Sequence, residues 1–270
     1  MKKVLFIILS FFLLLIVVPV DALSTNSKNI VLYNLDTNEK VFGYKDTEKV
    51  SIASLTKIMT AIVALENIDD LNKEVTITSD MLKGLKEKDA YVVGLKVGQK
   101  VSYIDLIYAC VISSGADATN AIAMSISGGL ERFVSLMNDK AKELGLSNTS
   151  FSNPIGFDDS NNYSSVDEVS KILIYALKNE TFKTIFTTDS HEFKDKSLTV
   201  KSSMRESAKH ANIDTSMIIG AKTGYETNAG RCLASIAYDK KNDINYLLVT
   251  TGADDDHNKM YNIKDAYELY

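Results

Sequence analysis

Apolar and polar residues alternate over residues 29–45, close to the start of the chain. The turn-forming residues Asp36, Thr37 and Asn38 interrupt this alternation, so the stretch predicts a β-hairpin. Apolar positions then recur with a helical period over residues 55–65, and Ser54 lies at the N-terminal edge of that predicted helix. The first part of the chain is therefore expected to form two paired strands followed by a helix.

The middle of the chain has a mainly helical pattern. Residues 75–105 predict short strands and turns, whereas residues 103–177 predict helices. Gly145 is expected to cap one amphipathic helix, and residues 164–177 predict a second one with a start rich in serine and aspartate. The apolar face of the first of these helices is expected to hold Leu130, Phe133, Val134, Met137, Ala141 and Leu144.

Strand-like patterns return near the end of the chain, over residues 216–224, 231–239 and 244–252. The polar stretch 239–243 separates the last two strands and favours an antiparallel pair, and residues 262–270 predict a closing helix. Strands that come early and late, with helices between them, indicate an α+β fold with an antiparallel sheet flanked by helices. We expect a sheet lobe of about residues 25–75 and 195–270, and an inserted, mainly helical lobe of about residues 76–194.

The first 22 residues have the pattern of a secretory signal peptide. Lys2 and Lys3 precede an apolar run from Val4 to Val20, and a small–x–small cleavage pattern ends at Ala22. An uncleaved membrane anchor is the alternative, because the run is close to the minimum length for spanning a bilayer. In either case residues 23–270 form a single domain that we expect to lie outside the cytoplasm.

Composition excludes several classes of partner. The chain has 270 residues, a formal charge of −5, and basic residues spread along its length, so we expect no nucleic-acid partner. His191, His210 and His257 lack the spacing of metal ligands, and we expect neither a metal nor another cofactor. The sequence leaves open whether Cys110 and Cys232 form a disulfide.

Ser54 and Lys57 are the first candidates for chemistry. Residues three apart lie on the same face of a helix, so the lysine can reach the serine hydroxyl. A lysine whose pKa is lowered by burial can take the proton of a serine and make it a nucleophile. A Ser-x-x-Lys pair alone is also expected by chance in a chain of this composition, so further residues must support the assignment.

Lys222, Thr223 and Gly224 provide that support at the end of a predicted strand. Lys222 could attract a substrate carboxylate, Thr223 could donate a hydrogen bond to it, and Gly224 allows close approach of the backbone. The next backbone N–H, that of Tyr225, could join the N–H of Ser54 in an oxyanion hole. The alternative is a strand that simply leads into a turn.

Ser114 is the third candidate, at the start of a predicted helix. Its hydroxyl could relay a proton between Lys57 and the leaving group, or it could act only as an N-cap.

Ser54-x-x-Lys57, Ser114 and Lys222-Thr-Gly224, in this order, resemble the serine D-alanyl-D-alanine carboxypeptidases, the low-molecular-mass penicillin-binding proteins. The resemblance covers about residues 25–270 and includes the stretches SSGADA, LGLSNTSFSNPIGFDD and GAKTGYETNAGRC. It implies a β-lactamase/transpeptidase-like fold, a Ser54 acyl-enzyme, Lys57 as base, Ser114 as relay and Lys222 as the residue that binds the substrate carboxylate.

The chain departs from the family pattern in two ways. The usual second motif is Ser-x-Asn, but here it is Ser114-Gly-Ala116, and Asn120 lies one helical turn further on. Many relatives also carry a further β-domain and a C-terminal amphipathic membrane helix, and we expect neither in a chain that ends at Tyr270.

The resemblance implies an exported hydrolase that removes the terminal D-Ala from peptidoglycan stem peptides ending in D-Ala-D-Ala, with β-lactams as covalent inhibitors. A β-lactamase is disfavoured because no Glu-x-x-Leu-Asn follows Ser114. A catalytically weak protein that binds penicillin or cell-wall peptides is the other alternative, because the usual asparagine is missing at Ala116.

Overall fold

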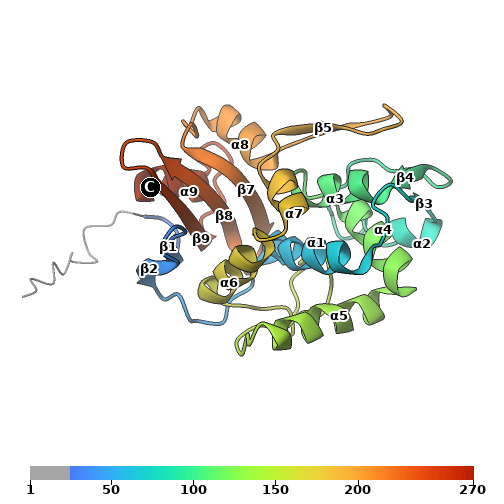
Figure 1. Cartoon of the computed structure of the whole chain (residues 1–270), viewed down its shortest axis with the longest axis horizontal. Coiled ribbons are helices and arrows are strands. Elements are labelled where there is room, and N and C mark those ends of the chain that lie inside the picture. Colours follow the sequence, from blue (N-terminus) through green and yellow to red (C-terminus); the bar gives the residue numbers. More distant parts are fainter. Residues whose placement is uncertain (1–24) are drawn as a thin grey trace, which may run out of the picture.

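The structure is a computed structural model that describes residues 25–270. The predicted signal peptide, residues 1–22, lies outside the described residues. Five antiparallel strands form the main sheet in the order β2-β1-β9-β8-β7 (Figure 1). These strands are β1 (Asn29–Asn34), β2 (Glu39–Tyr44), β7 (Ile218–Glu226), β8 (Gly230–Asp239) and β9 (Ile244–Ala253).

The predicted strand pairs are confirmed. Strands β1 and β2 form the early hairpin, and β8 and β9 pair in antiparallel fashion. Strand β9 also pairs with β1, so an early and a late segment of the chain meet in one sheet. Together with the helices between them, this sheet confirms the expected α+β fold.

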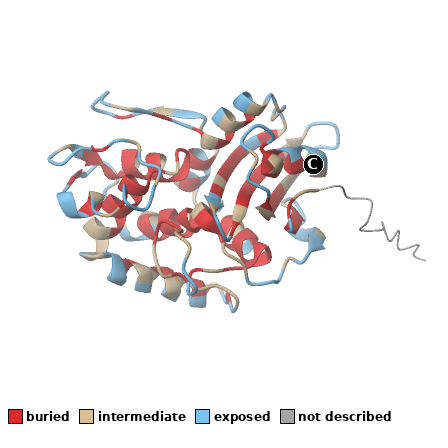
Figure 2. Ribbon diagram, turned by 180° about the vertical axis from the view of Figure 1, so that it is seen from behind, coloured by how far each residue is buried: buried red, intermediate tan, exposed pale blue. Residues whose placement is uncertain are grey.

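Both faces of the sheet are covered by helices. On one face α8 (Ser203–Ala211) and α9 (Tyr261–Leu269) bury alternate residues of the strands, such as Ile30 and Leu248. The intervening residues, such as Val31 and Val249, face the larger core around α1 (Thr56–Asn67) and α6 (Val166–Ala176). Burial on both faces accounts for the long apolar runs in β8 and β9. Buried residues run through the sheet and the central helices, and exposed ones lie on outer helices and loops (Figure 2).

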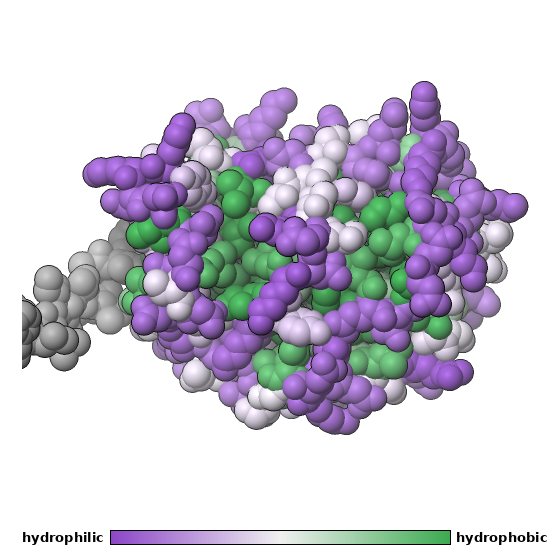
Figure 3. Space-filling view, viewed as in Figure 1, coloured by the Kyte–Doolittle hydropathy of each residue, from purple (hydrophilic) through white to green (hydrophobic). Residues whose placement is uncertain are grey.

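Further helices surround α1 on the side away from α8 and α9 (Figure 1). Two small two-stranded sheets, β3–β4 and β5–β6, belong to this part of the molecule. Polar side chains dominate much of the face shown in Figure 3. The remaining elements are β3 (Glu74–Thr76), α2 (Ser79–Leu82), β4 (Lys100–Ser102), α3 (Tyr103–Val111), α4 (Ala116–Ser127), α5 (Leu130–Glu143), α7 (Glu180–Phe186), β5 (Ser190–Glu192) and β6 (Thr199–Lys201).

Two details of the helical prediction were wrong. Leu130, expected on the buried face of α5, is 36% exposed, because it is the first residue of the helix and precedes the turn that packs on the core. Residues 144–165, expected to be helical, form an irregular connection held by two isolated bridges. Gly145 has φ 69° and follows Leu144, the C-cap residue of α5, so the left-handed glycine ends the helix as expected.

The division into a sheet lobe and a helical lobe stays a prediction. Helices α6 and α7 belong by sequence to the predicted helical lobe, yet α6 packs on β1 and β9, and α7 contacts β7. None of the helices in residues 25–270 has both the length and the apolar character needed to cross a membrane. Cys110 and Cys232 are both buried and free, so they form no disulfide.

Candidate active site

Ser54 lies in a short 3₁₀ turn, η2 (Ala53–Leu55), directly before α1. The preceding residue, Ala53, has φ 46°, an unfavourable backbone conformation for a residue with a Cβ atom. The turn packs against β7 so closely that a Cβ atom at Gly224 would lie 3.0 Å from the Ser54 nitrogen. The glycine of the Lys-Thr-Gly motif therefore lets the strand backbone approach the serine.

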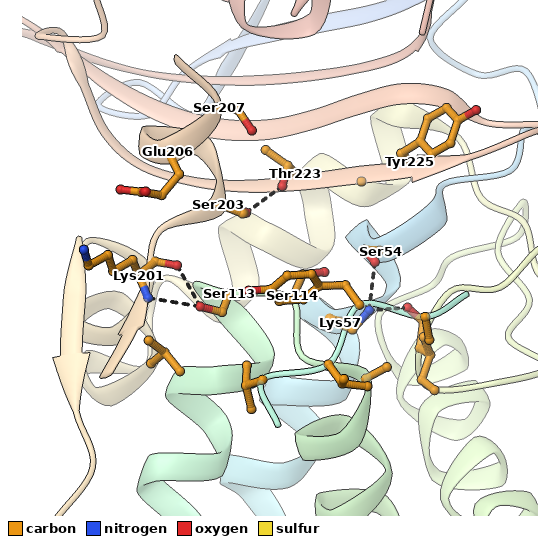
Figure 4. A pocket seen from close by; sticks show the side chains of 18 of the residues that line it. Ser54, Lys57, Ser113, Ser114, Lys201, Ser203, Glu206, Ser207, Thr223 and Tyr225 are labelled. Carbon is orange, nitrogen blue, oxygen red and sulfur yellow. Dashed lines mark hydrogen bonds between the residues drawn. The ribbon is translucent and has the colours of Figure 1, made fainter. Parts of the chain in front are cut away.

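Lys57 lies on α1, one helical turn after Ser54, and is only 1% exposed. Its Nζ is 2.8 Å from Ser54 Oγ and donates a second hydrogen bond of 2.8 Å to the Ile155 carbonyl oxygen (Figure 4). Burial lowers the pKa of Lys57 from 10.5 to about 8, because the protein interior solvates an ammonium group poorly. The side chain is thus next to the hydroxyl and close to the pKa that a general base needs at neutral pH.

Lys222 and Thr223 occupy different positions relative to the site. Lys222 is fully buried, and its Nζ donates to the Thr223 carbonyl oxygen at 2.8 Å. Burial, together with the nearby charge of Lys57, holds the pKa of Lys222 well below its usual value. The Thr223 hydroxyl lies 2.7 Å from Ser203 Oγ, and both hydroxyls face the site (Figure 4).

Ser114 precedes α4 and has φ 65°. The N-cap of α4 is Gly115, with no side-chain capping bond, so the N-cap alternative for Ser114 is wrong. The neighbouring Ser113 ties this turn to β6, since its hydroxyl donates to the Lys201 carbonyl oxygen at 2.7 Å. The hydrogen bond between Ser113 and β6 therefore fixes the turn that carries Ser114 beside the cavity.

Ala116, at the position where the expected Ser-x-Asn motif would have its asparagine, is 1% exposed and packs in an apolar cluster with Leu85 and Ile155. Asn120 does not replace the missing amide, because its side chain donates to the Met81 carbonyl oxygen at 3.1 Å and does not line the cavity.

A cavity of about 630 Å³ joins these residues. Its lining includes Ser54, Lys57, Ser114, Thr223, Gly224 and Tyr225, which come from three separate parts of the chain. Lys222 is the one candidate of the sequence analysis that does not line the cavity. Six of the seven predicted site residues thus meet around one opening, and the seventh lies behind its wall.

A family model for D-alanyl-D-alanine carboxypeptidase matches residues 17–255 of the chain. The chain belongs to this family. It is 32% identical over 235 residues to D-alanyl-D-alanine carboxypeptidase DacF of Bacillus subtilis, an alignment that covers 86% of this chain and 58% of DacF. It is 34% identical over 205 residues to the D-alanyl-D-alanine carboxypeptidase of Streptomyces sp. strain K15, covering 71% and 69% of the two chains.

The fold agrees with this membership. The crystal structure of the Streptomyces K15 DD-transpeptidase superposes with a TM-score of 0.80 at 26% sequence identity, covering 91% of this chain and 96% of that one. A D-alanyl-D-alanine carboxypeptidase structure from Mycobacterium tuberculosis has the same fold, with a TM-score of 0.77 at 21% identity.

Arg231 is a functional candidate that sequence reasoning missed. It pairs with Tyr225 across β7 and β8, lines the cavity, and forms an ion pair of 2.7 Å with Asp255. Its Nε is buried and has no hydrogen-bond partner among the described residues. Arg231 lies seven residues after Gly224 in the sequence. This spacing alone does not predict that the β7–β8 hairpin brings Arg231 to the cavity.

The histidines lie outside the Ser54–Lys57 centre. His191 contacts Asp105 at 2.7 Å, and His257 lies beside Arg231. Within residues 25–270, no three His, Cys, Asp or Glu side chains gather closely enough to hold a metal ion.

Proposed function

We propose that this member of the family is an exported serine D,D-carboxypeptidase, acting outside the cytoplasm, that removes the terminal D-Ala from peptidoglycan stem peptides. The chain spans 58% of the length of DacF, so the activity rests on the site itself as well as on the relatives. The observation that carries the proposal is the 2.8 Å contact between the buried Lys57 amine and the Ser54 hydroxyl.

Acylation begins with neutral Lys57. Its lone pair takes the proton of Ser54, and Ser54 Oγ attacks the carbonyl carbon of the penultimate D-Ala. The backbone N–H groups of Ser54 and Tyr225 stabilise the developing oxyanion, and the close packing of Gly224 on the Ser54 nitrogen supports this arrangement. The tetrahedral intermediate then collapses, the peptide C–N bond breaks, and Ser54 carries the acyl group.

The leaving D-Ala needs a proton on its amine. Ser114 lines the cavity with Lys57 and relays this proton, so Lys57 returns to its neutral form. Water then attacks the acyl-enzyme with the same base, which releases the shortened peptide and restores the Ser54 hydroxyl. No cofactor is required for any of these steps.

The terminal carboxylate of the substrate is held beside β7. The Thr223 hydroxyl lies in the cavity and donates to it, and Lys222 acts from behind Thr223 through its charge. A bound carboxylate favours the ammonium form of Lys222, which burial alone disfavours. Arg231 supplies a second positive charge along the same wall of the cavity.

Covalent labelling tests the proposed nucleophile. Incubation with penicillin should add one adduct by intact-mass spectrometry, and peptide mapping should place it on Ser54. Ser54→Ala should abolish the adduct while keeping the circular dichroism spectrum. An adduct that persists in Ser54→Ala would assign the nucleophile elsewhere.

One observation favours the catalytically weak binding protein as a second candidate. The Ala116 side chain lies in an apolar cluster, so this position offers no amide to the substrate. Steady-state release of D-Ala from a peptide ending in D-Ala-D-Ala separates the two functions. Turnover supports the carboxypeptidase, whereas a single penicillin adduct without D-Ala release supports the weak binder.

A further inference from the structure

The irregular connection between α5 and α6 reaches the catalytic lysine. The carbonyl oxygen of Ile155, in this connection, accepts a hydrogen bond of 2.8 Å from Lys57 Nζ. Neutral lysine has two N–H donors and one lone pair. An N–H held by Ile155 restricts rotation of the amine and leaves the lone pair free to face Ser54 Oγ, which lies 2.8 Å from the same nitrogen.

Asn153 holds this carbonyl in place. Its side-chain oxygen accepts from the backbone N–H groups of Gly156 at 2.7 Å and Phe157 at 3.0 Å, and its side-chain nitrogen donates to the Phe157 carbonyl oxygen. One amide group thus closes a tight loop over residues 153–157, with Ile155 at its centre. The Thr60 hydroxyl, on α1, donates to the Pro154 carbonyl oxygen at 2.7 Å and fixes the loop to the helix that carries Lys57.

The same loop touches the nucleophile turn. Gly156 has φ 98°, and a Cβ atom there would lie 2.0 Å from the Ala53 carbonyl oxygen and 3.0 Å from the Ser54 nitrogen. The loop therefore contacts both members of the reacting pair, Lys57 through a carbonyl and Ser54 through its backbone.

The Ala116 side chain packs with the Ile155 side chain. Both residues belong to one small apolar cluster with Leu85, at the edge of the cavity. An asparagine at position 116 would place a polar amide in this cluster and push against Ile155. The alanine and the Ile155 carbonyl are thus two parts of one arrangement.

We infer that Asn153 is a positioning residue that, through the Ile155 carbonyl, aims the Lys57 lone pair at Ser54, and that Ala116 is adapted to this loop. This inference rests on the proposed acyl-enzyme function. It assigns to a backbone carbonyl a hydrogen bond with Lys57 that the side chain of Ala116 cannot make.

Asn138 offers a matched control. Its side chain also forms hydrogen bonds with the backbone of the same connection. It donates to the Phe151 carbonyl oxygen at 2.8 Å and accepts from the Phe151 N–H at 2.9 Å. It lies on α5, does not line the cavity, and forms its hydrogen bonds with the backbone of Val134 and Phe151 and not with Lys57. Loss of either asparagine removes comparable hydrogen bonds, but only Asn153 adjoins the catalytic pair.

The test measures reversible binding and the acylation rate constant separately, with a chromogenic penicillin in stopped flow. Asn153→Ala should lower the acylation rate constant about 100-fold relative to Asn138→Ala, because small misplacements of a catalytic group cost this much. Reversible binding should change by less than about threefold, because the ligand contacts remain. The deficit should persist at about pH 9.5, where Lys57 is neutral, since orientation and not protonation is lost. Asn153→Asp, which keeps both acceptor contacts, should retain most of the rate.

The outcomes separate the inference from the function on which it rests. Equal acylation rates for Asn153→Ala and Asn138→Ala would overturn the positioning role while leaving the Ser54 acyl-enzyme intact. Absence of any adduct in the unmodified protein would instead overturn the proposed function.

A second set of variants covers the case in which Asn153→Ala does not fold. Ala116→Asn should lower the acylation rate constant, and the double variant Ala116→Asn, Ile155→Ala should recover part of it, because the truncated side chain makes room while the backbone carbonyl remains. A faster acylation in Ala116→Asn alone would show that Ala116 is a lost contact and would overturn its adapted role.

Discussion

Lys57 and Lys222 are both fully buried lysines in short motifs of this family, yet their surroundings differ. Lys57 Nζ contacts the Ser54 hydroxyl and the Ile155 carbonyl, and it lines the cavity. Lys222 Nζ contacts the carbonyl of its own neighbour, Thr223, and lies behind the cavity wall. Burial lowers the pKa of both, so a lowered pKa does not by itself identify the base.

The difference lies in contact with Ser54, the proposed nucleophile, which only Lys57 makes of the two lysines. A base must lie within hydrogen-bond distance of the proton it removes, and only Lys57 meets this condition. Lys222 can act on the substrate only through Thr223 and through its electric field, which decays with distance and with exposure to water. Replacing each lysine in turn by methionine, which keeps most of the apolar stem, therefore separates the two roles.

Lys57→Met should have the largest effect. Loss of the general base should lower the rate of penicillin acylation by about 10²–10⁴-fold at neutral pH, with an unchanged circular dichroism spectrum. Stopped-flow measurement with a chromogenic penicillin gives this acylation rate. A rate close to that of the unmodified protein would show that Lys57 is not the base. The proposed difference in role between Lys57 and Lys222 would then be wrong.

Lys222→Met should have a smaller effect that depends on the substrate. Loss of a charged partner of the carboxylate costs about 1.5–3 kcal/mol, so kcat/KM for a peptide with a free C-terminal carboxylate should fall roughly 10–100-fold. The same peptide with an amidated C-terminus is the control, and its already slow cleavage should change little. An equal loss for both peptides would mean that Lys222 supports the site without recognising the carboxylate.

The pH dependence of acylation sharpens the assignment of the base. As the proposed base, Lys57 acts in its neutral form, and its pKa is lowered to about 8, so the rate should rise with pH through about 8 and level off above about pH 9. About one tenth of the enzyme carries neutral Lys57 at pH 7, which predicts a gain of about tenfold between pH 7 and the plateau. A rate that is flat from pH 6 to 9 would contradict titration of this lysine.

Cys110→Ala should have the smallest effect. The Cys110 thiol lies near both lysines, but burial raises its pKa, so it stays neutral and contributes no charge to either of them. The midpoint of the pH profile should therefore stay in place, while thermal unfolding should show a loss of about 1 kcal/mol from the small cavity. A downward shift of the midpoint would reveal a thiolate that had been stabilising charged Lys57.

The sequence by itself determined several of the elements and six of the seven candidate residues that line the cavity. Alternation and turn residues placed the hairpin β1–β2 and the strands β8 and β9, because those patterns depend on neighbouring residues alone. The pairing of Ser54 with Lys57 followed from the geometry of one helical turn. The order of the three motifs then pointed to the residues that meet in the cavity.

Only the tertiary structure decided the contacts between distant segments. Lys57 and Ile155 are 98 residues apart, and their hydrogen bond exists because Asn153 closes a loop that the sequence pattern had suggested to be helical. The burial of Lys222 behind Thr223 and the turning of Arg231 into the cavity depend on how β7 and β8 pack. Periodicity reports which face of an element is apolar, but the atom that a side chain meets is set by the packing of other elements against it.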